Sequence, residues 1–149
     1  MEDIVIAIDP GAKGAAAIDY GKNVIALWNF DSESGAIQML DYVLSVGNAV
    51  ACIEEVGGFV GKNQPGSAMF KFGRNFGFWL GALMSRGVPV HLVRPQVWQR
   101  GISRVAGTKG AEHKRALRDE AKRLFPVQRV TLANADALLI LNWFKNNKK

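Results

Sequence analysis

The sequence predicts one α/β domain, residues 1–149, in which helices flank a mixed five-stranded sheet. Short apolar runs rich in branched residues and bounded by turn residues indicate strands, whereas other stretches place apolar residues at helix spacing. The order along the chain begins strand, strand, strand, helix, strand, which suits a mixed sheet with crossover helices. A chain of 149 residues is also long enough to bury a substantial core.

The first predicted hairpin begins with residues 4–8, an apolar run typical of a strand buried on both faces. The proline and glycines of "DPGAKG" supply turn chemistry, so residues 15–19 return as the second strand. This arrangement places Asp9 at the mouth of the turn, where the small side chains of residues 15–17 leave room for a phosphate to approach. The alternative is that Asp9 only forms the turn.

The remaining elements follow the same two patterns. Strands are predicted over residues 23–30, 49–56 and 89–93. Helices are predicted over residues 35–47, 108–126 and 134–144, with Ser34 as the N-terminal cap of the first.

The segment over residues 57–87 opens as a glycine-rich, basic loop and then acquires helix spacing. Its central apolar residues are predicted to lie in the core; they are Phe76, Phe78, Trp79 and Leu80. Basic side chains beside aromatic residues can contact the phosphates of a nucleic-acid backbone, which makes Lys62, Lys71 and Arg74 candidates for that role. For Lys62 and Arg74, ordinary solvent exposure explains the sequence equally well.

The charge balance favours a polyanionic partner, although many basic domains bind none. The formal net charge is +6 and the pI is about 9.7. The single cysteine, Cys52, lies within an apolar run, which excludes a disulfide framework and a thiolate metal cluster and indicates a reducing compartment. No signal peptide precedes the first strand and no apolar stretch is long enough to span a bilayer, so we expect a cytoplasmic protein without membrane contact.

Three acidic positions lie within apolar sequence: Asp9 closes the first predicted strand, Glu54 or Glu55 ends the fourth, and Asp136 begins the last helix. A buried charge without a partner is costly, and a divalent cation would compensate all three. Carboxylate oxygens from separate elements suit Mg²⁺ in a site that cleaves a phosphodiester. Strand alternation allows only one of Glu54 and Glu55 to join Asp9. Taken alone, Asp136 also fits a residue that only stabilises a helix N-terminus.

Six segments carry a family resemblance: "IAIDPGAKGAAAI", "CIEEV", "GSAMFKFGRNFGFWLGAL", "PVHLVRPQVWQ", "HKRALRDEAKRLFP" and "NADALLI". They occur in the order found in the RuvC-like Holliday-junction resolvases, particularly the compact phage-type branch, and they cover nearly the whole chain. The resemblance implies a ribonuclease H-like fold, dependence on Mg²⁺ or Mn²⁺, a homodimer, and paired symmetrical nicks across a four-way DNA junction. It also implies a phage- or bacterium-encoded protein of DNA recombination and repair.

The family motifs assign the catalytic and metal-binding roles to Asp9, Glu54 and Asp136, and leave Glu55 as a supporting or surface residue.

One position departs from the family pattern. The family has an acid, or an acid and a histidine, three or four residues before the last aspartate, on the same helical face. Leu132 and Ala133 stand there in this sequence, and Asn134 lies about 200° away around a helix. Either another side chain completes the site, or metal binding is weak, or an acid has been replaced.

The residues predicted to contact DNA are Lys13, Lys62, Lys71, Arg74, Lys109 and Lys114. Acidic residues alternate with the bases of residues 108–126, so a solvated, locally paired helix face is the alternative for Lys109 and Lys114.

The sequence therefore predicts a structure-selective, metal-dependent endodeoxyribonuclease that resolves four-way junctions. The alternative is a catalytically impaired protein of the same fold that only binds branched DNA, as the missing acid would allow. A third interpretation is an ATP-binding protein of the wider actin-like group, with "DPGAKG" bent around phosphates. The short chain argues against it, because that chemistry usually needs a second lobe.

Overall fold

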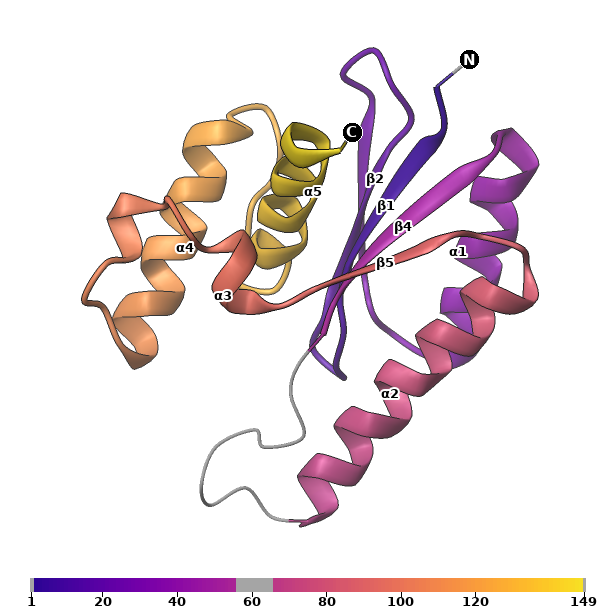
Figure 1. Cartoon of the computed structure of the whole chain (residues 1–149), viewed down its shortest axis with the longest axis horizontal. Coiled ribbons are helices and arrows are strands. Elements are labelled where there is room, and N and C mark those ends of the chain that lie inside the picture. The colour runs from indigo at the N-terminus through magenta and orange to yellow at the C-terminus, as the bar shows by residue number, and fades with distance from the viewer. Residues whose placement is uncertain (1, 56–65, 149) are drawn as a thin grey trace.

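The computed structural model describes residues 2–55 and 66–148 as an α/β fold built on one five-stranded sheet (Figure 1). The strands are β1 (Ile4–Asp9), β2 (Ala15–Asp19), β3 (Ile25–Asn29), β4 (Ala49–Glu54) and β5 (Val90–Val93). Their order across the sheet is β3-β2-β1-β4-β5. The β1–β2 and β2–β3 pairs are antiparallel, whereas the β1–β4 and β4–β5 pairs are parallel. The predicted mixed five-stranded sheet is confirmed.

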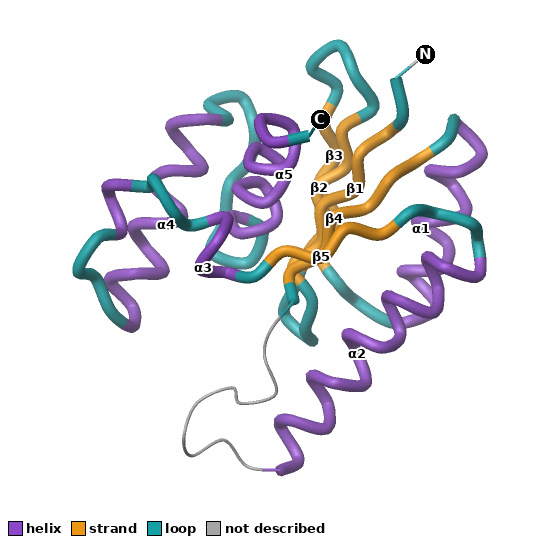
Figure 2. Tube along the Cα trace, in the orientation of Figure 1, coloured by secondary structure: helices purple, strands orange, loops and turns teal. Residues whose placement is uncertain are grey.

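Helices cover both faces of this sheet. They are α1 (Glu33–Val46), α2 (Gly66–Ser85), α3 (Pro95–Trp98), α4 (Gly110–Leu124) and α5 (Ala135–Asn147), with a 3₁₀ turn, η1 (Ser103–Val105), before α4. α1 and α2 lie on one side, and α3, α4 and α5 lie on the other (Figures 1 and 2). Among the described residues, none of these helices combines the length and the apolar character needed to cross a membrane.

Strand alternation divides the buried residues between the two sides of the sheet. Along β1, residues 4, 6 and 8 join the core under α1 and α2, while residues 5 and 7 join the core under α4 and α5. Along β4, residues 49, 51 and 53 and residues 50 and 52 divide in the same way. Asp9 and Glu54 continue the second series in their strands. Both carboxylates therefore belong to the side covered by α5.

The turn between β1 and β2 depends on two glycines. Gly11 has a φ of +124°, which glycine adopts far more readily than other residues. A Cβ placed on Gly14 would lie only 2.0 Å from the carbonyl oxygen of Asp9, so a side chain there would collide with the backbone. The Gly14 amide donates to the Gly11 carbonyl oxygen at 3.0 Å and closes the turn. The predicted turn chemistry is confirmed, and it fixes the backbone just beyond Asp9.

The prediction for the start of α1 was wrong by two residues. The helix begins at Glu33, and its cap is Ser32 rather than Ser34. Ser32 has an extended backbone, and its Oγ accepts a hydrogen bond from the Gly35 amide at 2.9 Å. Apolar periodicity locates the helix but does not show at which residue it begins. The N-cap is the residue just before the first one with helical backbone angles.

The core assignments in α2 are confirmed. Trp79 is fully buried, and Phe76, Phe78 and Leu80 are partly buried against the same cluster. Residues 56–65 lie outside the described part of the chain, so the predicted DNA contact of Lys62 lies there as well.

Candidate functional site

Parallel pairing brings Asp9 and Glu54 to the same edge of the sheet. Ile8 of β1 lies beside Ile53 of β4, so the residue that follows each one stands at the carboxyl end of its strand. Glu54 is buried and Asp9 is partly buried. The alternation of β4 excludes Glu55 from this group, because neighbouring side chains point to opposite faces.

Asp136 reaches the same place from the first turn of α5, which packs on β1 and β2. It is buried. Burial raises the pKa of Asp9 well above its usual range, and the nearby charges of Asp136 and Glu54 raise it further. Burial also raises the pKa of Asp136. The structure thus brings together the three carboxylates that the sequence singled out.

Trp98 is a part of this site that the sequence analysis missed. Its Nε1 donates a hydrogen bond to Glu54 Oε2 at 2.6 Å, in buried surroundings. Burial raises the pKa of Glu54 to about 7, while this hydrogen bond acts in the opposite direction. α3 carries Trp98 and follows β5, whose last residue, Val93, pairs with Glu54. The sequence signal that could have revealed this contact is the position of Trp98, five residues after the end of β5, the strand that pairs with β4.

Lys114 lies with the carboxylates, which adds to its predicted role as a DNA contact. Its Nζ is 3.6 Å from Asp136 Oδ2. Its positive charge lowers the pKa of Asp136 and also opposes the raised pKa values of Asp9 and Glu54. One ammonium group therefore faces three carboxylates.

The two positions expected to hold a further acid lie just before α5 rather than inside it, because the helix begins at Ala135. Leu132 is 50% exposed, so its side chain is not part of the core. The Ala135 amide still donates to the Thr131 carbonyl oxygen at 3.0 Å, so this turn keeps helix-like spacing.

Neighbouring polar residues do not supply the missing acid. Asn134 uses its side chain within the turn: Oδ1 accepts from the Thr131 amide at 2.8 Å and Nδ2 donates to the Arg129 carbonyl oxygen at 3.1 Å. Both ring nitrogens of His113 are engaged, with Thr108 Oγ1 at 2.9 Å and Gln99 Oε1 at 3.0 Å. Within residues 2–55 and 66–148, no three His, Cys, Asp or Glu side chains lie close enough together to hold a metal ion as they stand.

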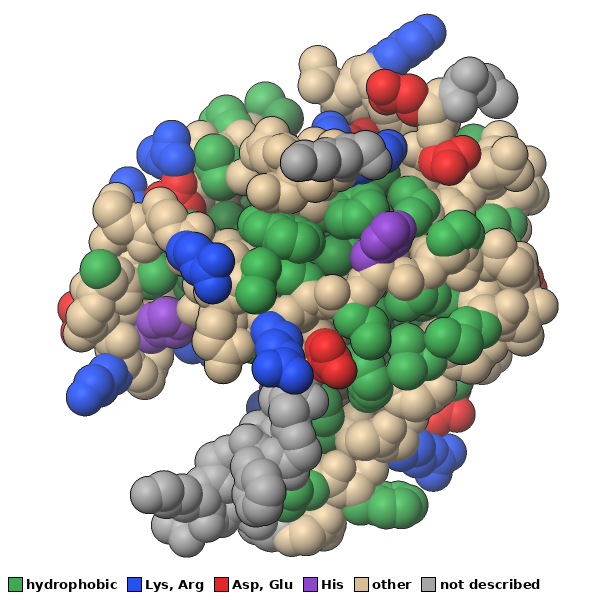
Figure 3. All heavy atoms as spheres, viewed as in Figure 1, with side chains coloured by type: hydrophobic (Ala, Val, Ile, Leu, Met, Phe, Trp, Pro, Cys, Tyr) green, Lys and Arg blue, Asp and Glu red, His purple; other side chains and the backbone are tan. Residues whose placement is uncertain are grey.

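The predicted DNA contacts fall into two groups. Lys13, Lys71 and Arg74 line a hollow between the β1–β2 turn and α2. Lys109 is exposed at the start of α4, the helix that also carries Lys114. Figure 3 shows Lys and Arg side chains spread over the visible face rather than gathered in one stripe. On this face, basic side chains do not form one continuous patch.

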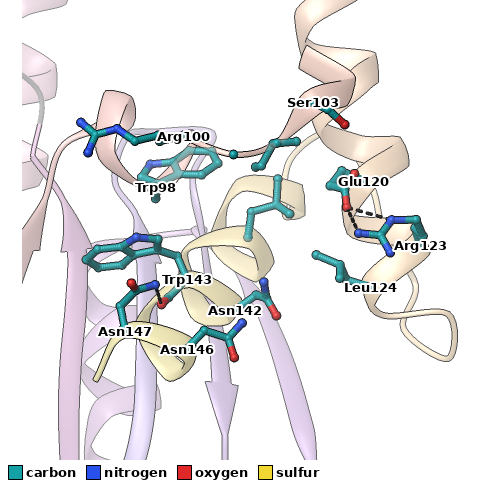
Figure 4. A pocket seen from close by; sticks show the side chains of 13 residues that line it. Trp98, Arg100, Ser103, Glu120, Arg123, Leu124, Asn142, Trp143, Asn146 and Asn147 are labelled. Carbon is teal, nitrogen blue, oxygen red and sulfur yellow. Dashed lines mark hydrogen bonds and ion pairs between the residues drawn. The ribbon is translucent and has the colours of Figure 1, made fainter. Parts of the chain in front are cut away.

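A separate cavity of about 290 Å³ lies among α3, α4 and α5 (Figure 4). Trp98 and Trp143 form part of its wall, and Glu120 pairs there with Arg123. The three carboxylates are not among the residues that line it. This cavity is therefore distinct from the site at the end of the sheet.

Comparison with solved structures identifies the fold. Thermus thermophilus RuvC is 20% identical, with a TM-score of 0.58, over 96% of this chain and 95% of that one. The chain has the RuvC fold. A structure of T. thermophilus RuvC in complex with a Holliday junction substrate is 14% identical, with a TM-score of 0.63, over 97% of this chain and 96% of that one. No family model and no curated protein matches the sequence. The predicted RuvC-like, ribonuclease H-like architecture is confirmed at the level of the fold.

Proposed function

We propose that this RuvC-like chain is a metal-dependent endonuclease that resolves four-way DNA junctions by paired symmetrical nicks. The observation that carries the proposal is the convergence of Asp9, Glu54 and Asp136, from β1, β4 and α5, near the ammonium group of Lys114. The likeness to a RuvC bound to a Holliday junction, over nearly the full length of both chains, supports the choice of substrate.

The three carboxylates suit a divalent cation because the described residues place too little positive charge near them to balance theirs. Their pKa values are raised by burial and, for Asp9 and Glu54, by neighbouring carboxylates, and one lysine offsets only part of this. Asp9, Glu54 and Asp136 would hold Mg²⁺, or Mn²⁺, through oxygen ligands. When bound, the metal activates water and stabilises the leaving oxygen of the phosphodiester.

The other residues of the site hold these groups in place. Trp98 orients Glu54 by donating a hydrogen bond to Oε2, which leaves Oε1 available as a ligand. Lys114 holds Asp136 and adds a positive charge where a phosphate would approach. Gly14 lets the turn close tightly against the Asp9 backbone, because a side chain there would collide with the Asp9 carbonyl oxygen. Lys13, Lys71, Arg74 and Lys109 contact phosphates away from the cleaved bond, and such contacts supply most of the affinity but little sequence preference.

The absence of an acid at Leu132 and Ala133 weakens the ligand set for a second ion. We therefore expect a high Mg²⁺ requirement or a preference for Mn²⁺, which accepts less regular geometry. The same observation favours the second candidate function, a protein that binds branched DNA and cleaves it poorly. The two candidates differ only in turnover.

Symmetrical nicks require two active sites related by a two-fold axis, so the proposal includes an isologous homodimer. Met69 and Phe70, which are 36% and 70% exposed on α2, are the apolar residues proposed for its interface. Sedimentation at micromolar concentration, with and without a junction, checks this; a monomer under both conditions contradicts it.

The central test compares a four-way junction with a linear duplex of the same sequence. Binding is measured without divalent cations, and nicking is measured in Mg²⁺ and in Mn²⁺. The nuclease proposal expects preferential binding to the junction and paired nicks that need a metal. Preferential binding without nicks in either metal supports the binding protein instead, and equal binding to both DNAs overturns both candidates.

A further inference from the structure

The "FKFGRNFG" stretch of α2 is not explained by the core or by the carboxylate site. Phe76, Phe78 and Trp79 pack in the core under α1 and α2. Phe72 is partly buried, yet it belongs to neither buried cluster of the described residues. An aromatic side chain that the core does not use is free to contact something else.

Phe72 lines the hollow between α2 and the β1–β2 turn, which has a volume of about 490 Å³. The turn contributes Gly11 and Ala12, which follow Asp9 by only two and three residues, and Phe30 forms a second aromatic part of the wall. Pockets of roughly 300–1,000 Å³ hold small organic ligands, so a single nucleotide fits within this space.

Positive charge surrounds the apolar walls. Lys13, Lys71 and Arg74 all line the hollow, and Lys13 and Lys71 are exposed. Glu33 is the one acidic residue among those that line it, and it is already paired with Arg74, with 3.1 Å between Arg74 Nε and Glu33 Oε1. Apolar, aromatic walls inside a cationic rim match a nucleotide, whose base is planar and whose phosphate is anionic.

Asn75 connects this hollow to the carboxylate site. It is 8% exposed, and its Oδ1 accepts a hydrogen bond from the Gly11 amide at 2.7 Å across 64 residues of sequence. Among the described residues, Nδ2 makes no hydrogen bond. Asn75 therefore fixes the turn that follows Asp9 and presents a hydrogen-bond donor in the wall of the hollow.

We propose that this hollow binds one unstacked nucleotide of the DNA strand next to the cleaved phosphodiester. The base lies against Phe72 and Phe30, and the phosphate lies at the rim formed by Lys13 and Lys71. Asn75 Nδ2 donates to the base or to its sugar-phosphate. Because Asn75 also holds Gly11, the bound nucleotide and the metal-binding turn share one rigid contact. The inference rests on the proposed function for the position of the nucleotide relative to the nick.

The test uses 2-aminopurine, a fluorescent base, placed in turn at each nucleotide that flanks the exchange point of a four-way junction. Fluorescence is read without divalent cations, so that no cleavage is needed. The unaltered protein should change the fluorescence at one position. Phe72→Ala should remove that change and weaken binding about 5- to 150-fold, the range reported for single stacked bases. Phe72→Tyr keeps an aromatic ring and should restore both.

Met84→Ala is the matched control, because Met84 lies on the same helix, is 63% exposed and does not line the hollow. It should leave the fluorescence change intact. If Phe72→Ala and Met84→Ala behave alike while the unaltered protein still nicks junctions, the nucleotide site is wrong and the nuclease function stands. If the Phe72-dependent signal is present but no metal supports nicking, the nucleotide site stands and the nuclease function fails. If Phe72→Ala instead lowers self-association and leaves the fluorescence unchanged, a second copy of the chain covers the hollow and the inference is overturned.

Discussion

Buried carboxylates lie at both ends of the β1–β2 hairpin, and the two ends balance charge differently. At one end, Asp19 is 4% exposed, accepts a hydrogen bond from the Gly21 amide at 2.8 Å and forms an ion pair with Lys145. At the other end, Asp9 is grouped with Glu54 and Asp136. Lys114 is the lysine beside them in the described residues, and His113 also acts to lower the pKa of Asp136.

The difference separates a structural ion pair from a candidate reactive site. One lysine for one carboxylate neutralises the charge, and it ties β2 to α5. One lysine for three carboxylates leaves a deficit that folding alone does not explain, because burying unbalanced charge costs stability. Functional sites keep such unbalanced buried charges when a bound ligand balances them.

The largest expected effect comes from exchanging one carboxylate at each end. Asp9→Asn should reduce nicking at least about 100-fold, the effect of losing one group that stabilises a reacting charge. Binding to a four-way junction should change little, because phosphate contacts elsewhere supply it. Gel-based nicking and filter binding measure the two quantities.

Asp19→Asn is the matched control, since it alters the structural ion pair. It should lower the free energy of unfolding by about 1–3 kcal/mol, and leave nicking unchanged wherever the protein is folded. If Asp9→Asn still nicks junctions, or if Asp19→Asn loses nicking to the same extent, the assignment of a reactive role to Asp9 and a structural role to Asp19 is wrong.

The second prediction concerns pH in the absence of divalent cations. The pKa of Glu54 is raised from 4.5 to about 7, so the folded protein retains a proton that the unfolded chain releases between these values. The unfolded state then binds fewer protons, and the free energy of unfolding falls as pH rises through this window. One such group accounts for about 3 kcal/mol at most.

Thermal denaturation at several pH values, with and without Mg²⁺, checks this. Tm should fall from acidic to neutral pH without the metal, and Mg²⁺ should restore part of the loss at neutral pH. Glu54→Gln should flatten the profile. A Tm that rises with pH in the absence of metal would contradict the prediction, because it would show that nearby positive charges already stabilise the ionised carboxylates in the folded protein.

The third prediction tests the orientation of Glu54. Trp98→Phe retains most of the buried aromatic volume but removes the indole N–H that donates to Glu54 Oε2. Groups that orient a metal ligand typically contribute 10- to 100-fold to metal affinity or activity, so we expect about a 10-fold loss of nicking. The pKa of Glu54 should rise further, because the hydrogen bond holds it down. An unchanged pH profile for nicking, with Tm preserved, would contradict this role.

The smallest effect is expected from restoring an acid before Asp136. Leu132→Asp adds a carboxylate at a position that is 50% exposed, so it should fold normally. It should lower the Mg²⁺ concentration needed for nicking about two- to fivefold, which corresponds to roughly 0.5–1 kcal/mol for an exposed charge interaction.

Leu132→Asn controls for the change of shape, and Ala133→Asp tests the neighbouring position. Mg²⁺ titrations of nicking for the three variants, with Tm as a check on folding, decide the matter. If both acidic variants fold and neither changes the metal requirement, the gap in the ligand set is not at these positions.

Local patterns determined much of this protein. The apolar runs and turn residues located the five strands, because side-chain alternation and turn chemistry depend on near neighbours in sequence. They also placed Asp9 at a strand end, Glu54 or Glu55 near another and Asp136 at a helix start. The family resemblance chose Glu54, and the structure ends β4 at that residue. The cap of α1 was misplaced, since Ser32 and Ser34 differ only in which one leaves the helical backbone.

Contacts between distant segments were decided only by the tertiary structure. The sheet order places Val93 beside Glu54. As a result Trp98, which is 44 residues from Glu54 in sequence, lies within hydrogen-bond distance of the Glu54 carboxylate. The packing of α4 against α5 brings Lys114 to Asp136, and α2 brings Asn75 to Gly11. No periodicity encodes such pairs, because each depends on how whole elements pack, and they set the charge balance of the site.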